Sequence, residues 1–175
     1  MEDSKAIIEA IIFTSENPVQ IDKIREVLPD VEKGEISRLI KELMDEYEKR
    51  SGGFILLEVA GGFQFRTRAD LGYWISKFLK GRPAILSRAA MEALAVIAYK
   101  QPVLKSEVDS FRGVDSGSSL KGLLERKLVR IMGRKDVPGR PIMYGTTKKF
   151  LEVFNLKDLA ELPTLKELKD LHKET

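Results

Sequence analysis

The same order of predicted elements occurs twice along the chain, before and after a Lys-Gly-Arg-Pro break at residues 80–83. Each half begins with an apolar helix that stops at a proline followed by valine, at Pro18 and again at Pro102. A short helix, a turn, a third helix and a β-hairpin follow in both halves. This order is typical of a winged helix-turn-helix domain. The sequence therefore predicts an α+β, mainly helical fold of two tandem winged helix-turn-helix domains.

The first half alternates helical and strand patterns. Apolar residues at helical or strand spacing predict helices over 4–15, 20–28, 32–50 and 71–79, and strands over 54–59 and 63–67. Ala60-Gly61-Gly62 joins the two strands and can supply the positive φ angles of a tight hairpin. In the helix 71–79, the apolar residues recur at offsets 0, 3, 4, 7 and 8, which makes a clean amphipathic face.

The second half repeats the pattern with different residues. Its predicted elements are helices over 89–98, 105–111 and 148–154, a third helix that buries Leu120 to Leu128, and strands 129–132 and 142–144. Ser87 is expected to cap the first of these helices, and Asp115 or Ser116 the third. Pro138-Gly139 lies at the tip of the long hairpin loop, which carries Arg134, Lys135 and Arg140.

The predicted domains span residues 1–82 and 83–160, and residues 161–175 form a partly flexible tail. Leucine recurs every third residue from Leu156 to Leu171, interrupted by Pro163. A period of three drifts around an α-helix, so one long amphipathic helix is excluded. We expect a short helical turn packed on the second domain, followed by a loosely held end.

The composition offers little material for catalysis. The 175 residues include no cysteine and one histidine, His172, four residues from the C-terminus. Disulfides and cysteine metal sites are therefore excluded, and no P-loop is present, so we expect neither an enzyme nor a bound cofactor or metal. No apolar run approaches the length of a membrane helix, and the acidic start of the chain is unlike a secretory signal. We expect a cytoplasmic protein.

The two halves differ in charge. Residues 1–86 hold 13 Lys and Arg against 15 Asp and Glu, whereas residues 87–175 hold 17 against 12. The first half would repel phosphate, but the second has a basic wing in which Arg134, Lys135 and Arg140 could contact it. A DNA-binding regulator is therefore an alternative, although the third helix begins Gly117-Ser118-Ser119, without Arg, Asn or Gln for base reading. A solvated basic face and a domain that binds some other protein also remain open.

Surplus apolar surface suggests protein partners. Helix 4–15 carries Ile7, Ile8, Ile11 and Ile12, a stripe wider than one core-facing side needs. Such a stripe packs on the rest of its domain or on a second copy of the chain.

Residues 86–165 closely resemble the family of segregation and condensation protein B. The most specific pieces are LAVIAYKQPV, RGVDS, LLERKLV and GRKDVPGRPIMYGTT, and AIIEAIIFTSENPVQIDKI at residues 6–24 resembles the start of that family. The match covers most of the chain in consistent order.

The resemblance implies a non-enzymatic subunit of a chromosome segregation and condensation complex, associated with the nucleoid. It implies a homodimer joined through the N-terminal domains, for which we expect contacts from helix 1 and the helix 71–79, namely Ile7, Ile8, Ile11, Ile12, Trp74 and Phe78. It also implies binding to the kleisin, segregation and condensation protein A, which bridges the heads of the structural-maintenance-of-chromosomes (SMC) ATPase. We expect the C-terminal domain to make this contact. The expected kleisin contacts are Arg112, Val114, Asp115, Ser116, Ser119, Arg134, Arg140 and Tyr144. Contact with the ATPase would be indirect, and contact with DNA weak or indirect.

Overall fold

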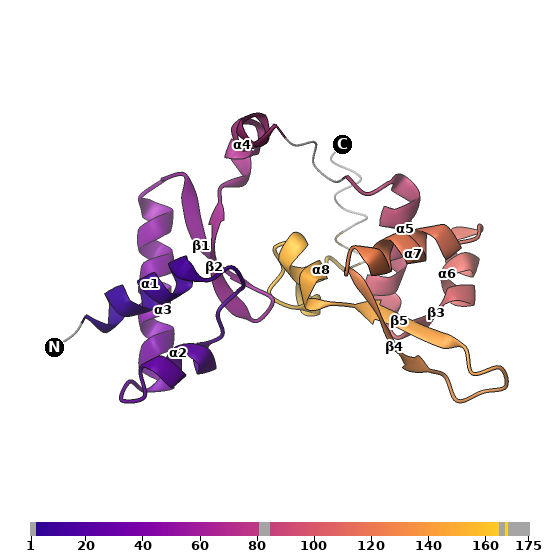
Figure 1. Cartoon of the computed structure of the whole chain (residues 1–175), viewed down its shortest axis with the longest axis horizontal. Helices are drawn as coiled ribbons and strands as arrows, with labels where there is room; N and C mark the ends of the chain where they lie inside the picture. The colour runs from indigo at the N-terminus through magenta and orange to yellow at the C-terminus, as the bar shows by residue number, and fades with distance from the viewer. Residues whose placement is uncertain (1–2, 81–84, 165–166, 168–175) are drawn as a thin grey trace. The chain divides into compact units, whose positions relative to one another are not determined.

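The computed structural model describes residues 3–80, 85–164 and 167 of the chain. Two compact units are present, Met1–Pro83 with Leu156–Thr175, and Ala84–Asn155. In each unit three helices precede a β-hairpin, as Figure 1 shows. The predicted fold class, two tandem winged helix-turn-helix domains, is confirmed.

The first unit packs three helices beside a two-stranded sheet. Its elements are α1 (Ser4–Thr14), α2 (Ile21–Val27), α3 (Lys33–Lys49), β1 (Phe54–Val59), β2 (Gly62–Thr67), η1 (Ala69–Leu71), α4 (Gly72–Leu79) and η2 (Leu159–Glu161). Asp3 caps α1, because its side chain accepts hydrogen bonds from the amides of Lys5 and Ala6. The centre of the core is formed by Ile8, Ile12, Ile24, Ile36, Ile40, Leu43, Leu56 and Phe63.

The hairpin of this unit turns where the sequence predicts. Ala60 and Gly61 have φ angles of 52° and 74°, which the left-handed turn requires. Val19, just after the proline that ends α1, exchanges two backbone hydrogen bonds with Phe63, at 2.8 and 2.9 Å. The first helical connection is thereby tied to the edge of the sheet.

The second unit has the same plan with a three-stranded sheet. Its elements are α5 (Arg88–Lys100), β3 (Val103–Leu104), α6 (Lys105–Arg112), α7 (Gly117–Glu125), β4 (Val129–Arg134), β5 (Ile142–Thr146) and α8 (Lys148–Val153). The strand order is β3-β5-β4 with antiparallel pairing, so β4 is an edge strand. Ser87 caps α5 as predicted, by accepting a 3.2 Å hydrogen bond from the amide of Ala90. β3 has two residues, too few to show strand periodicity in the sequence.

The chain after α8 does not pack as the sequence suggests. Residues from Leu156 onward group with the first unit, not the second. The amides of Ala60 and Gly61 donate to the carbonyls of Leu156 and Lys157, at 2.9 and 3.1 Å, and Lys157 pairs with Glu58 at 3.0 Å. The predicted packing of this segment on the second domain is therefore wrong, because its carbonyls accept hydrogen bonds from amides at the β1–β2 turn of the first unit. The predicted loose end, with His172, lies outside the described residues.

Candidate partner-binding surfaces

Helix α4 leaves its apolar face uncovered. None of its residues is buried, and Figure 1 shows it standing apart from α1, α2 and α3. Trp74 and Phe78, two of the expected dimer contacts, are 63% and 83% exposed. Tyr73 lies edge-on to Trp74 with ring centroids 5.2 Å apart, so the aromatic residues form a cluster. Exposed apolar clusters often mark interaction surfaces, so the α4 face is a candidate partner-binding surface.

The expectation for α1 needs correction. Ile8 and Ile12 are 0% and 1% exposed, because they form the centre of their own unit's core. They offer no surface to a second copy. Ile7 and Ile11 are half-buried, and Phe13 is exposed and lies edge-on to Phe65. The face of α1 that a partner can reach is thus narrower than the sequence indicates.

Two of the expected kleisin contacts, Arg112 and Ser116, instead stabilise the turn between α6 and α7. The side chain of Arg112 is 5% exposed, donates a 3.0 Å hydrogen bond to the Ser116 hydroxyl and lies 3.6 Å from Glu92. Ser116 is fully buried, and Ser119 is 9% exposed. Arg112 and Ser116 are therefore structural in this unit, and a partner cannot reach them without disturbing the turn. Ser119 is largely buried but lines a surface pocket with Ser118 and Arg126.

The same turn contains an ion-pair network. Lys105 donates to Asp109 at 2.7 Å and also to Asp115, and the Ser116 amide donates to Asp109 at 2.7 Å. The Lys105 hydrogen bond lowers the pKa of both carboxyls below their ordinary value, and the two carboxylates raise the pKa of Lys105. Asp115, rather than Ser116, satisfies the first amide of α7, by accepting from Gly117 at 2.9 Å. Asp115 and Val114 remain exposed at this turn.

A groove of about 470 Å³ lies between α6 and the β-hairpin, and we call it the wing groove. It is lined by Leu104, Lys105, Ser106, Asp109, Arg134, Pro141, Ile142 and Tyr144. Two expected kleisin contacts, Arg134 and Tyr144, therefore lie together. Arg140 is adjacent, because its carbonyl accepts a 3.0 Å hydrogen bond from Arg134. Ile131 is the cross-strand partner of Tyr144 and is 53% exposed, so apolar surface continues onto β4.

The sequence does not reveal the α6 side of this groove. Lys105, Ser106 and Asp109 occupy polar positions of a short helix, which a pattern reading assigns to solvent. They become groove residues because β3 pairs with β5 and holds the start of α6 beside the hairpin. No sequence signal marks such a contact, since β3 itself is too short to detect.

The described parts of the chain contain no group of three His, Cys, Asp or Glu side chains that could hold a metal ion. Within the same residues, no helix is long and apolar enough to cross a membrane. The exposed surfaces are suited to binding a partner through apolar and charged contacts. They are the aromatic face of α4 in the first unit and the wing groove in the second.

Two winged-helix units with uncovered apolar surfaces define the chain as a tandem winged-helix protein. The family model for the segregation and condensation complex subunit ScpB matches residues 6–165. The chain therefore belongs to the ScpB family.

Two curated relatives agree with this assignment, and one solved structure is also similar in sequence. Segregation and condensation protein B of Syntrophotalea carbinolica is 48% identical over 171 residues, which cover 98% of this chain and 86% of that protein. The protein of the same name from Myxococcus xanthus is 42% identical over 97% of this chain and 51% of its own length. A crystal structure of a dimer of the ScpB N-terminal domain with an ScpA peptide is 28% identical, over 43% of this chain and 93% of that one, with a TM-score of 0.40.

Proposed function

We propose that the protein is a non-enzymatic, homodimeric subunit of a chromosome segregation and condensation complex, and that it binds the kleisin subunit ScpA. Membership of a family described as a complex subunit supports this role. The observation that carries the proposal is that each unit keeps apolar surface uncovered after its own core is complete. The SMC ATPase would be reached through the kleisin, in the cytoplasm at the nucleoid.

The dimer contact is assigned to the first unit, through α4. An isolated helix of eight residues is marginal in water, and α4 gains no buried residue from its own unit. A two-fold contact in which the α4 faces of two copies meet would cover Trp74 and Phe78 in both copies at once. Ile7, Ile11 and Phe13 on α1 would then contact the second copy only at the margin of this interface.

The kleisin contact is assigned to the wing groove of the second unit. Leu104, Pro141, Ile142 and Tyr144 give it apolar walls, and Arg134 provides a cation at its edge. This combination suits a segment with apolar anchor residues and an acidic neighbour, because the anchors fill the groove and the charge fixes their register. Val114 and Asp115, exposed at the turn after α6, remain candidates for further contacts.

The proposal is tested with the full chain, by mass measurement and by titration with a purified ScpA fragment in isothermal calorimetry. We expect a dimer that binds the fragment. Ile142→Ala and Arg134→Gln should each weaken binding at least about tenfold, the effect of removing a central contact worth roughly 1.4 kcal/mol.

Ile85→Ala is the matched control, because Ile85 is 79% exposed and does not line the wing groove. It should leave the affinity unchanged. A monomer that ignores the fragment contradicts the whole proposal, whereas equal losses in Ile85→Ala and Ile142→Ala contradict the assignment to this groove.

A further inference from the structure

In the second unit, the cations that form no ion pair are concentrated in one stretch of the sequence. Arg88, Lys105, Arg112 and Lys149 each form an ion pair. Between residues 85 and 155, the cations that make no ion pair and no contact with an aromatic ring are Lys121, Arg126, Lys127, Arg130, Arg134, Lys135, Arg140 and Lys148. All of them fall between α7 and the start of α8. Only Glu125 and Asp136 supply negative charge in that stretch.

Backbone pairing gathers six of these cations into two clusters at the ends of the β4–β5 hairpin. At its base, the Thr147 hydroxyl donates to the carbonyl of Lys127 at 2.6 Å, which places Lys148 beside Lys127, and Arg130 pairs with Gly145 nearby. We call Lys127, Arg130 and Lys148 the base cluster. None of the three forms an ion pair among the described residues, so their charges are available to an external anion.

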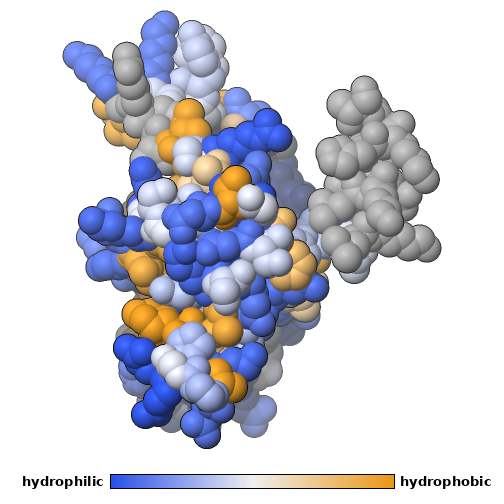
Figure 2. Space-filling model, turned by 90° about the vertical axis from the view of Figure 1, so that its right-hand side faces the viewer, coloured by the Kyte–Doolittle hydropathy of each residue, from blue (hydrophilic) through white to orange (hydrophobic). Residues whose placement is uncertain are grey.

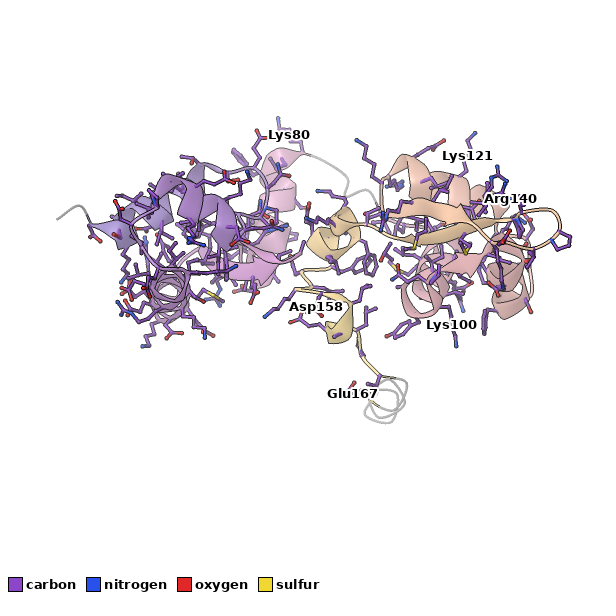
Figure 3. All side chains as sticks on the ribbon, turned by 90° about the horizontal axis from the view of Figure 1, so that it is seen from below. Lys80, Lys100, Lys121, Arg140, Asp158 and Glu167 are labelled. Carbon is purple, nitrogen blue, oxygen red and sulfur yellow. The ribbon has the colours of Figure 1, made fainter. Side chains whose placement is uncertain are left out.

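The second cluster lies at the tip of the hairpin. Arg134 donates to the carbonyl of Arg140, and the Lys135 amide donates to the carbonyl of Pro141 at 2.9 Å. These bonds hold Arg134, Lys135 and Arg140 together as the tip cluster. Figure 3 shows Arg140 on the hairpin loop at the far end of the unit, with Lys121 projecting from α7.

The spacing of the clusters favours a long, evenly charged anion. Arg130 and Lys135 are five residue steps apart, a span of at most roughly 17 Å in an extended strand. Duplex DNA carries one charge per about 1.7 Å of its axis, so this span faces roughly ten phosphate charges. An acidic peptide would also need pockets for alternate side chains along β4. The nearest groove, lined by Ile142 and Tyr144, instead opens toward α6.

The third helix indicates that the bases are not read. α7 begins Gly117-Ser118-Ser119, and its exposed side chains near that end, Ser118 and Lys121, lack the bidentate amide or guanidinium groups that recognise base edges. Figure 2 shows this end of the unit as mostly hydrophilic, with apolar side chains in separate patches. Proteins that bind single strands stack the bases on aromatic side chains, and none of the six cluster residues is aromatic.

We propose that the base and tip clusters bind the sugar–phosphate backbone of duplex DNA, without sequence preference. Arg134 opposes Ile142 on the groove face of the hairpin, whereas Arg130 opposes Gly145 on the other face, and Lys127, Lys135, Arg140 and Lys148 lie outside the paired strands. The five cations other than Arg134 can therefore follow the backbone of the same duplex. Arg134 belongs to the wing groove assigned to the kleisin, but the other five cations line neither that groove nor the proposed dimer surface, so the contact goes beyond the proposed function.

The test measures binding of the full chain to a labelled 20-base-pair duplex by fluorescence anisotropy, between 50 and 200 mM KCl. If the five cations other than Arg134 contact phosphates, the slope of log affinity against log salt is about −4.5. The base variant, Arg130→Gln with Lys148→Gln, and the tip variant, Lys135→Gln with Arg140→Gln, should each reduce that slope by about 1.8. Each should also lower the affinity at 0.1 M salt by up to about sixtyfold.

Lys41→Gln with Lys49→Gln is the matched control, since it removes the same charge from exposed, unpaired positions of α3 in the first unit. Its slope and affinity should equal those of the unaltered chain. Equal losses in the control and in both hairpin variants overturn the proposal, because they reveal only the effect of net charge. Absence of binding at 50 mM KCl also overturns it, as does tighter binding of a single strand or of polyglutamate at the same residues. Both hairpin variants should still bind the ScpA fragment. A loss of DNA binding with retained fragment binding distinguishes the DNA contact from the proposed function.

Discussion

Removal of the aromatic residues of α4 should dissolve the dimer without unfolding the chain. The variant Trp74→Ala with Phe78→Ala deletes two side chains that are 63% and 83% exposed in their own unit. Aromatic side chains bury about 150–250 Å² each, so the exposed part of each is roughly 150 Å². Two residues in two copies then provide about 600 Å² of a contact that typically buries about 1,600 Å².

The expected loss in affinity follows from this area. Truncation of an aromatic contact near the centre of an interface commonly costs more than about 1 kcal/mol, and a two-fold contact contains every residue twice. Four truncated side chains therefore weaken the dimer by at least about 4 kcal/mol, a thousandfold change in dissociation constant. Sedimentation equilibrium between nanomolar and micromolar concentrations measures a shift of this size.

Two further measurements make the result specific. Val27→Ala removes an exposed apolar side chain from α2 of the same unit and should leave the dimer intact. The melting temperature of the dilute monomer should be unchanged in the double variant, because neither Trp74 nor Phe78 contributes to the core. A double variant that retains the original dissociation constant, or an unaltered chain that stays monomeric at high concentration, would refute the assignment to α4.

The remaining predictions concern stability. Gly62→Ala should destabilise the chain by about 1–3 kcal/mol in urea denaturation, because a Cβ there would lie 2.9 Å from the backbone of Pro18. Gly34→Ala, where nothing lies within 4 Å, should instead stabilise by up to about 1 kcal/mol, and a reversed order would contradict the reasoning. Lys105 lowers the pKa of Asp109 below 3.8, so this carboxylate's stabilisation is present above about pH 4 and is lost as the pH falls further. Asp109→Asn should flatten that acid limb of the stability profile, and an unchanged limb would show that other carboxylates dominate it.

The helices and hairpins could be predicted because their patterns are local. Leu120 and Leu123 are buried in α7, and Ala93, Leu94 and Ile97 in α5, as their helical spacing indicates. The course of the chain after α8 could not be predicted in this way. It depends on carbonyls of Leu156 and Lys157 that accept from the β1–β2 turn, and a backbone hydrogen bond leaves no trace in residue types.

The expected contact residues also differ in how far the sequence could predict their position. The pattern predicts that a polar residue at a turn is exposed, yet Arg112 hydrogen-bonds to Ser116 inside the unit and both side chains are buried. Arg134 and Tyr144 could be predicted from the sequence as contact residues, because both lie in the protruding hairpin that the strand pattern predicts. Their position in one groove with Lys105 depends on strand pairing, which only the structure provides.

The contrast between α1 and α4 shows where apolar surplus arises. Both helices have apolar faces in the sequence, and a pattern shows the face but not what covers it. In α1 the residues Ile8 and Ile12 turn toward α3 and the sheet and fill the core, so their substitution acts on folding. In α4 the preceding η1 carries the helix away from that core, and Phe78 has nothing to pack on in its own unit. The exposed apolar surface available to the proposed dimer therefore belongs to α4, and the more apolar sequence of α1 is explained by the core of its own domain.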